Sequence, residues 1–230
     1  MKIAILGAMR EEIEPILEKV GKYTSEEHAG NIFYQAHFEG HDLVIAYSKI
    51  GKVFSAITAS VMIERYGIEV LLFSGVAGGI SKELKIGDLI MATQLCQHDV
   101  DITAFGHPDG FIPESTVMID TDASLRELAI GIANDFDLQL KEGIIATGDQ
   151  FVANPERKLW IETTFSADAL EMEGASVACV CANFDIPFFV LRAISDTADG
   201  HAEIDFDAFL KSSAQVSAQF VLEMVKRLGN

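Results

Sequence analysis

The stretch LEMEGASVACVCANFDIPFFVLRAISDTAD, residues 170–199, decides the fold of this chain. Its residues 174–184 are apolar on nearly every face of a helix, which is typical of a buried helix. Residues 187–194 then form an almost continuous apolar run, as in a strand that is covered on both faces of a sheet. Acidic residues stand at both ends of this unit: Glu171, Glu173, Asp196 and Asp199. Because buried carboxylates are costly and are common at active sites, we expect the functional site at these ends.

Strand and helix patterns alternate along the rest of the chain. Apolar runs predict strands at 2–6, 32–38, 43–48, 70–74, 89–95 and 143–147. Helical patterns predict helices within 7–21 and at 53–66, 124–136, 155–164 and 206–228. No repeat, linker or low-complexity stretch divides this pattern, so we expect one domain, residues 1–230, built as a three-layer α/β/α sandwich. Loops that follow the strands should then carry the site.

Composition excludes several classes of partner. The chain has 230 residues, of which 49% are apolar and 23% charged, as in an ordinary globular protein. A net charge of −18 argues against nucleic acid and anionic membranes as partners, because both attract positive surfaces. No apolar run reaches the roughly 18 residues that span a membrane, and the first residues lack a signal-peptide pattern. The three cysteines, Cys96, Cys179 and Cys181, are expected to be reduced thiols in the cytoplasm.

The segment 7–21 offers the first candidate acid. Its apolar residues recur at helical spacing: Met9, Ile13, Ile16, Leu17 and Val20. Glu12 lies at one edge of that stripe, and Arg10 borders the other edge. Glu12 is either a first-turn acid that the helix dipole stabilises or a functional carboxylate. Arg10 is expected to pair with a neighbouring acid.

Two further acids and a buried arginine belong to the opening stretch. Glu171 and Glu173 alternate with Met172 on a short extended segment, so one of the two carboxylates must face inward. Glu173 can also be a first-turn helical acid, and Asp196 can be a turn or N-cap residue. Arg192 interrupts an apolar strand, and a guanidinium there needs either an internal acid or a ligand oxygen.

The glycine-rich pieces match no nucleotide-binding template. The sequence SGVAGG at 74–79 follows an apolar run but lacks the GxGxxG spacing. The sequence IGK at 50–52 resembles the end of a P-loop. However, Ala46 and Val53 stand where a P-loop needs Gly and Ser or Thr. The pattern therefore gives little support to a triphosphate or dinucleotide site, although these glycines permit close approach of the backbone to a ligand.

The segment 98–101 and Phe151 contain residue types that occur in binding sites. The sequence HDVD at 98–101 contains metal-ligand residue types, but no second cluster with matching spacing accompanies it, so we expect no metal. Phe151 follows a predicted strand. It is either a ring that stacks on a base or one of the 15 phenylalanines that fill a core.

Seven motifs, in this order and spacing, resemble the bacterial 5′-methylthioadenosine/S-adenosylhomocysteine nucleosidases of the nucleoside phosphorylase superfamily. They are GAMREE (7–12), IGKV (50–53), SGVAGG (74–79), HDVDITAFG (98–106), GDQF (148–151), EMEGA (171–175) and RAISDTAD (192–199). The resemblance covers essentially the whole chain. It is greatest to the subgroup that also cleaves 6-amino-6-deoxyfutalosine in menaquinone synthesis. It implies a nucleoside phosphorylase-like fold with a mixed central sheet.

The resemblance implies a division of labour among three acids in the hydrolysis of an N-glycosidic bond, with release of adenine. Asp196 would protonate purine N7, Glu12 would activate the attacking water, and Glu173 would bind the ribose hydroxyls. Such cleavage needs a protonated leaving group and a stabilised cation, which an acid of raised pKa and two ionised carboxylates can supply. Hydrolysis needs no cofactor. A carboxylate at Glu12 would repel the phosphate that the related phosphorylases bind, which favours water as the nucleophile.

The resemblance also implies the substrate contacts. Phe151 would stack on the adenine, backbone groups of Phe151 and Val152 would read its edge, and Arg192 would lie beneath the ribose. The other implied binding residues are Met9, Ile50, Val76, Met172, Ser195 and Phe206, of which the methionines line the ribose and Phe206 covers the purine or the 5′ side. Phe105 and Pro113 would reach the 5′-substituent pocket of a neighbouring subunit, so the resemblance implies a homodimer.

The chain departs from the family pattern at three positions. Val76 stands where many members have Ser, Lys49 where they have Gly, and His107 where a Tyr is common. These departures bear on the preferred 5′-substituent more than on the reaction. A phosphorolytic nucleoside phosphorylase and a non-catalytic nucleoside-binding module remain the alternatives.

Overall fold

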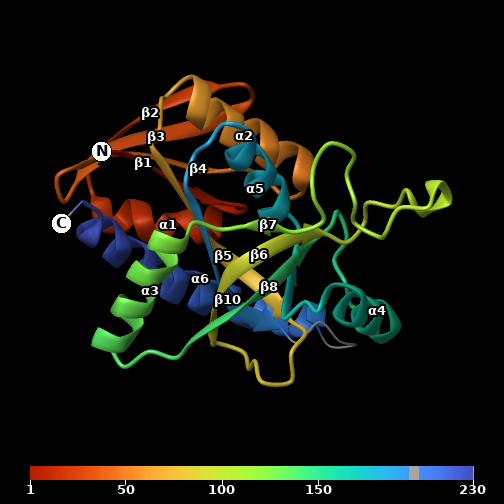
Figure 1. Ribbon diagram of the computed structural model, residues 1–230. Coiled ribbons are helices and arrows are strands. Elements are labelled where there is room, and N and C mark those ends of the chain that lie inside the picture. Colours follow the sequence, from red (N-terminus) through yellow and green to blue (C-terminus); the bar gives the residue numbers. More distant parts are fainter. Residues whose placement is uncertain (197–201, 230) are drawn as a thin grey trace.

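The computed structural model describes residues 1–196 and 202–229 (Figure 1). Asp199 lies outside the described residues. The strands are β1 (Lys2–Gly7), β2 (Tyr23–His28), β3 (Asn31–Phe38), β4 (His41–Tyr47), β5 (Val70–Gly79), β6 (Leu89–Gln97), β7 (Ile119–Asp120), β8 (Leu140–Thr147), β9 (Ala169–Glu171) and β10 (Phe188–Asp196). The helices are α1 (Arg10–Val20), α2 (Lys52–Glu64), α3 (Ala123–Asp135), α4 (Pro155–Phe165), α5 (Gly174–Asn183) and α6 (Ala202–Arg227), and η1 (Thr103–Phe105) is a short 3₁₀ turn.

The strands of the described residues form one mixed sheet. Strands β10, β5, β1 and β4 run parallel, whereas β2 and β3 add an antiparallel edge. The sheet also closes on itself, because β10 pairs with both β5 and β6, and β8 and β9 complete the circuit back to β5. The expected mixed sheet is confirmed. Its closure, which the alternating pattern did not predict, brings the ends of strands distant in sequence around one space.

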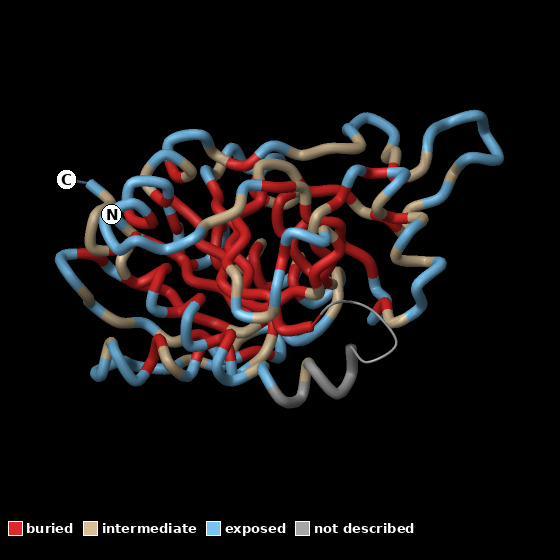
Figure 2. Tube along the Cα trace, turned by 90° about the horizontal axis from the view of Figure 1, so that it is seen from below, coloured by how far each residue is buried: buried red, intermediate tan, exposed pale blue. Residues whose placement is uncertain are grey.

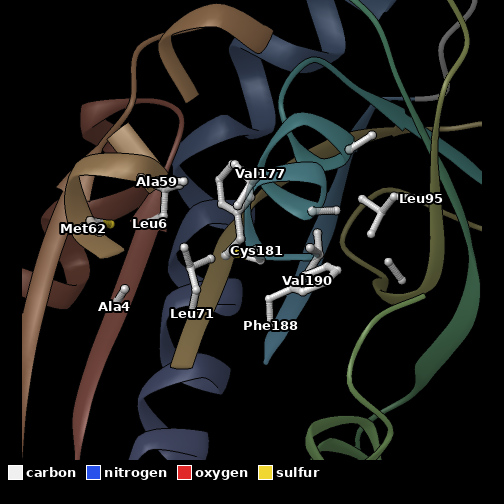
Figure 3. Close-up of a cluster of buried hydrophobic side chains, with 14 of the residues drawn as sticks. Ala4, Leu6, Ala59, Met62, Leu71, Leu95, Val177, Cys181, Phe188 and Val190 are labelled. Atoms are coloured by element: carbon white, nitrogen blue, oxygen red, sulfur yellow. The ribbon is translucent and has the colours of Figure 1, made fainter. Parts of the chain in front are cut away.

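Helices cover both faces of this sheet, as the three-layer prediction required. On β1, Ile3 and Ile5 face a cluster with α1, α3 and α6, whereas Ala4 and Leu6 face a cluster with α2 and α5. Figure 3 shows the second cluster, in which Val177 and Cys181 of α5 pack against sheet residues. The buried residues concentrate in the sheet and the inner helix faces, with exposed residues around them (Figure 2).

The strands differ from the prediction in two informative places. Strand β5 continues through Gly79, whereas the apolar run predicts a strand only over 70–74. Its glycines are poor strand formers alone, but pairing with β10 and β9 keeps them extended. Strand β2 was missed because its sequence, YTSEEH, is polar and lies at the sheet edge. None of the helices within the described residues is long and apolar enough to cross a membrane.

Candidate active site

A cavity of about 360 Å³ opens where several of these strands end, and its size suits a small molecule. Most of the predicted site residues line it: Met9, Glu12, Ile50, Val76, Phe151, Val152, Met172, Glu173, Ser195, Asp196 and Phe206. The fold therefore joins carboxylates from both ends of the chain in one cavity. The other lining residues are Ala8, Ala77, Gly78, Gln150, Leu170 and Glu171, of which the sequence had singled out Glu171. The first four lie within the motifs GAMREE, SGVAGG and GDQF, which is the signal that points to them.

Glu12 is held by backbone amides on two segments. Its Oε2 accepts hydrogen bonds from the amides of Ala8 (2.6 Å) and Met9 (2.9 Å), and its Oε1 accepts one from Val76 (2.9 Å). A Cβ at Gly75 would lie 2.7 Å from Glu12 Oε1, so a glycine is needed there. Glu12 thus closes the first turn of α1 and also lines the cavity, which is compatible with both readings of this residue.

Glu12 is only 2% exposed, and burial raises its pKa even though Arg192 and the backbone amides act in the opposite direction. A carboxylate with a raised pKa is a stronger base than one in water. Arg10, which was expected to pair with a nearby acid, donates from Nε to Glu14 Oε1 at 2.7 Å on the exposed side of α1.

Both acids of the opening stretch are buried, where only one was expected to face inward. Glu171 ends β9 and Glu173 precedes α5, and the sharp turn between strand and helix brings both carboxylates inside. Glu173 Oε1 accepts a hydrogen bond from the amide of Gly51 at 2.8 Å. Burial and the negative charge of Glu171 raise the pKa of Glu173 to about 8. A pKa this high favours the protonated form of Glu173 at neutral pH, whereas the resemblance implies an ionised carboxylate there.

Arg192 finds an internal acid as its partner. Its Nη2 donates to Glu171 Oε2 at 2.8 Å, and the Arg192 side chain is only 1% exposed. Glu171 also accepts from the amides of Glu173 and Gly174 and from the hydroxyl of Thr147. Arg192 is not among the residues that line the cavity, although its charge opposes the rise in the pKa of both Glu12 and Glu173.

Asp196 is the last residue of β10, which runs two residues further than the predicted strand at 187–194. The register with β5 shifts between Ile194 and Asp196, and irregularities of this kind re-aim side chains next to active sites. Ser195 Oγ donates to Asp196 Oδ2 at 3.0 Å, and both residues line the cavity. Asp196 is 3% exposed, so its carboxyl is largely shielded from bulk solvent.

Two aromatic rings meet at the cavity wall. Phe151 and Phe206 lie 5.9 Å apart between ring centroids and are nearly perpendicular, at 81°. Phe151 is 47% exposed, which is unusual for a core phenylalanine and leaves its face free for a flat ligand. Of the two readings of Phe151, the geometry therefore favours the stacking ring over the core residue.

A comparison with known proteins shows which family this chain belongs to. The family model described as the phosphorylase superfamily matches residues 2–226. The chain belongs to the phosphorylase superfamily. An aminodeoxyfutalosine nucleosidase of Campylobacter jejuni is 55% identical over 228 residues, which cover 99% of this chain and all of that protein. A Helicobacter pylori protein of the same name is 54% identical, with 99% of each chain covered.

A solved structure of the same superfamily extends this likeness to three dimensions. The 5′-methylthioadenosine/S-adenosyl homocysteine nucleosidase of Helicobacter pylori, solved in complex with a pyrrolidinol compound, is 54% identical. It superposes with a TM-score of 0.98 over 99% of both chains. The expected membership and the nucleoside phosphorylase-like fold are thus confirmed.

Four positions named from the sequence, Phe105, Pro113, His107 and Lys49, are not among the residues that line the cavity. Phe105, in η1, is 82% exposed on a loop that projects from the body of the molecule, and Pro113 on the same loop is exposed (Figure 1). His107 on that loop stacks on Phe111. Lys49 adopts a positive φ of 73°, a conformation that glycine takes more easily, and its ammonium donates to the carbonyl of Gly30.

The segment 98–101 does not form a metal site in the part of the chain that the structure describes. No group of three or more His, Cys, Asp or Glu side chains suited to hold a metal ion occurs among the described residues. His98 instead contacts Arg157, whose Nη2 lies 3.1 Å from His98 Nδ1. Burial and the charge of Arg157 lower the pKa of His98 to about 4.

The raised pKa of Glu173 predicts an unusual pH dependence of stability. At Glu173 the native state binds more protons than the unfolded chain between the unfolded value of 4.5 and about 8, so the contribution of this group to the free energy of unfolding falls as pH rises through this window. This group contributes a slope of up to about 1.4 kcal/mol per pH unit. Glu173→Gln keeps an oxygen for the Gly51 amide, so we expect the variant to be more stable than wild type above neutral pH.

Urea unfolding at several pH values from 5 to 8 measures this difference. The exposed substitution Glu142→Gln is the matched control and should reproduce the wild-type slope. A Glu173→Gln variant whose unfolding free energy follows the wild-type pH dependence would contradict a raised pKa for Glu173.

Proposed function

We propose that this chain hydrolyses the N-glycosidic bond of 5′-substituted adenosines and releases adenine, with Asp196 as general acid and Glu12 as the base that activates water. The reaction class agrees with the chain's relatives, which are named as nucleosidases. In the same proposal, Glu173 binds the ribose hydroxyls and Phe151 stacks on the adenine.

The charge of the cavity carries the proposal of hydrolysis. Four carboxyl residues line it, namely Glu12, Glu171, Glu173 and Asp196, and none of the described lining residues is Lys, Arg or His. A phosphate nucleophile would need cationic donors in the cavity and would be repelled by whichever of these acids are ionised. Among the described residues, the one guanidinium that contacts any of these acids belongs to Arg192, and it is bound to Glu171. Water is therefore the better nucleophile, and an oxocarbenium-like transition state is favoured here.

Proton positions follow from the same geometry. Glu12 is fixed by three amides, so its carboxylate is oriented before substrate arrives and loses little entropy on reaction. In the proposal, Glu12 takes a proton from water, and the resulting hydroxide character attacks C1′. Asp196 gives its proton to purine N7, so that adenine leaves as a neutral molecule. Glu173 passes its proton to solvent as it accepts hydrogen bonds from the ribose hydroxyls.

The substrate is proposed to be one or more of three nucleosides: 5′-methylthioadenosine, S-adenosylhomocysteine and 6-amino-6-deoxyfutalosine. Relatives at about equal identity carry names for both kinds of substrate. A competition assay that compares kcat/KM for the three nucleosides decides among them. Adenine release from at least one is the expected result. Binding of all three without any adenine release would instead favour a non-catalytic binding module.

A homodimer is the proposed assembly. Apolar side chains at the start of α2 are exposed, each between 44% and 67%: Ile50, Val53, Phe54 and Ile57. Such a patch is typical of a surface that another protein covers. Phe105 is also exposed and is proposed to complete the 5′-substituent pocket of the second subunit.

The proposed location is the cytoplasm. All three cysteines are free thiols, which supports this location.

Phe105→Ala tests the shared pocket. We expect the KM for S-adenosylhomocysteine, with its long 5′-substituent, to rise about tenfold because a buried phenyl contact is lost. The KM for 5′-methylthioadenosine should rise less. Phe136→Ala removes a ring that is also exposed (54%) and serves as the matched control. A variant that is monomeric by sedimentation, yet keeps wild-type KM for both substrates, would count against this pocket.

A further inference from the structure

Three residues from separate segments of the chain form a closed hydrogen-bonded ring beside the cavity. Lys52 Nζ donates to Asp99 Oδ1 at 2.6 Å, the amide of Asp149 donates to Asp99 Oδ2 at 2.9 Å, and the amide of Lys52 donates to Asp149 Oδ1 at 2.8 Å. Lys52 begins α2, Asp99 follows β6 and Asp149 follows β8. The motifs IGKV, HDVD and GDQF thus meet in one place, and the catalytic proposal gives none of these three side chains a role.

The ring is stronger than an ordinary surface ion pair. The side chains of Lys52 and Asp99 are only 18% and 15% exposed, so water screens their attraction little. Burial alone would raise the pKa of Asp99, but the hydrogen bonds from Lys52 and from the Asp149 amide outweigh it and lower that pKa. Lys52 Nζ also donates to Gln97 Oε1 at 3.1 Å, which fixes the direction of the ammonium.

The ring touches both ends of the proposed substrate site through its chain neighbours. Gly51, next to Lys52, donates its amide to Glu173 Oε1. Gly51 has a φ of 100°, and a Cβ there would lie 3.0 Å from Asp149 Oδ1, so both the backbone conformation and the close approach require glycine. On the other side, Asp149 is two residues before Phe151, which lines the cavity.

We propose that the ring of Lys52, Asp99 and Asp149 holds the Gly51 amide in place against the loop that carries Phe151. Through this amide the ring positions the Glu173 carboxylate, and it thereby sets the preference for nucleosides with intact ribose hydroxyls. The inference rests on the proposed role of Glu173 and deepens it. These three are positioning residues, because none of them lines the cavity. When the ring is opened, Glu173 loses its fixed donor, and its carboxylate no longer meets the ribose in one geometry.

Lys52→Met opens the ring without removing the Lys52 amide. The probe is a C-nucleoside analogue of adenosine, whose base is joined to the sugar by a carbon–carbon bond that water cannot cleave, in ribose and 2′-deoxyribose forms. Calorimetry gives the ratio of the two affinities, that of the ribose form divided by that of the 2′-deoxyribose form. We expect this ratio to fall on the order of tenfold in Lys52→Met, because a hydrogen bond to a charged group is misplaced. Lys52→Arg, which keeps the charge and the donors, should restore most of the ratio.

Lys141→Met is the matched control. Lys141 also bridges acids, Glu83 and Asp168, with a side chain that is 23% exposed, but it lies near the other end of β8. It should leave the ratio unchanged. A folded Lys52→Met protein with the wild-type affinity ratio would overturn the inference. A Lys52→Arg protein whose affinity ratio falls as far as that of Lys52→Met would also overturn it. Wild type that binds the analogues with the expected ratio but releases no adenine from any nucleoside would instead overturn the proposed function alone.

Discussion

Asp196→Asn is expected to lower the rate of adenine release by about 10²- to 10⁴-fold while the protein stays folded. An amide has no proton acidic enough to transfer to purine N7, so adenine would have to leave as an anion. Asn keeps the size of Asp and can still accept the hydrogen bond from Ser195 Oγ. Stopped assays of adenine release, together with urea unfolding of the same preparation, measure both parts of this expectation.

A substrate with a better leaving group separates proton donation from structure. A 4-nitrophenyl riboside needs no protonation to leave, so its hydrolysis should be largely retained in Asp196→Asn. Asp122→Asn is the control for the chemical change, since Asp122 caps α3 and asparagine caps equally well. Near-normal adenine release by Asp196→Asn would remove Asp196 from the role of general acid, and an equal loss on both substrates would assign it a structural role.

Glu12→Gln is expected to lower kcat at least about 10²-fold with nucleoside binding largely retained. The glutamine cannot take a proton from water, although its oxygen can still accept from one of the amides around Glu12. The pH profile gives a second readout. The base must be ionised, so wild-type kcat/KM should rise with pH through the raised pKa of Glu12, and this acid limb should lie above 4.5.

Glu11→Gln changes the exposed neighbour in the same helical turn and should leave both the rate and the profile intact. A Glu12→Gln variant that loses affinity but keeps kcat would place Glu12 in substrate binding. An acid limb at or below 4.5 in wild type would show that Glu12 is not the group that titrates.

The elements that could be predicted are those with strong local patterns. The apolar run at 187–194 is strand β10, and the stripe that contains Ile13 and Ile16 is helix α1. The polar edge strand β2 and the glycine-rich end of β5 could not be predicted, because pairing with neighbours, not local propensity, makes them strands. Closure of the sheet is likewise a property of pairing between distant strands.

The candidate site divides in the same way. The acids themselves were visible in the sequence, and the motifs assigned them roles by resemblance. The sequence left open whether Arg192 meets an acid or a ligand, and the fold answers with Glu171. It gave no sign that Glu171 and Glu173 are both buried, since the chain turns between them. The ring of Lys52, Asp99 and Asp149 joins positions 47, 50 and 97 residues apart, and no local pattern encodes such contacts.

The most direct test of the central claim is the phosphate dependence of adenine release, with identification of the sugar product. Wild-type protein would be assayed on 5′-methylthioadenosine in phosphate-free buffer and at saturating phosphate. The cavity is lined by acids, and none of its described lining residues is Lys, Arg or His, which predicts equal rates in the two buffers and a free 5′-substituted ribose as product. A rate that requires phosphate, with a ribose 1-phosphate as product, would contradict hydrolysis and establish a phosphorylase.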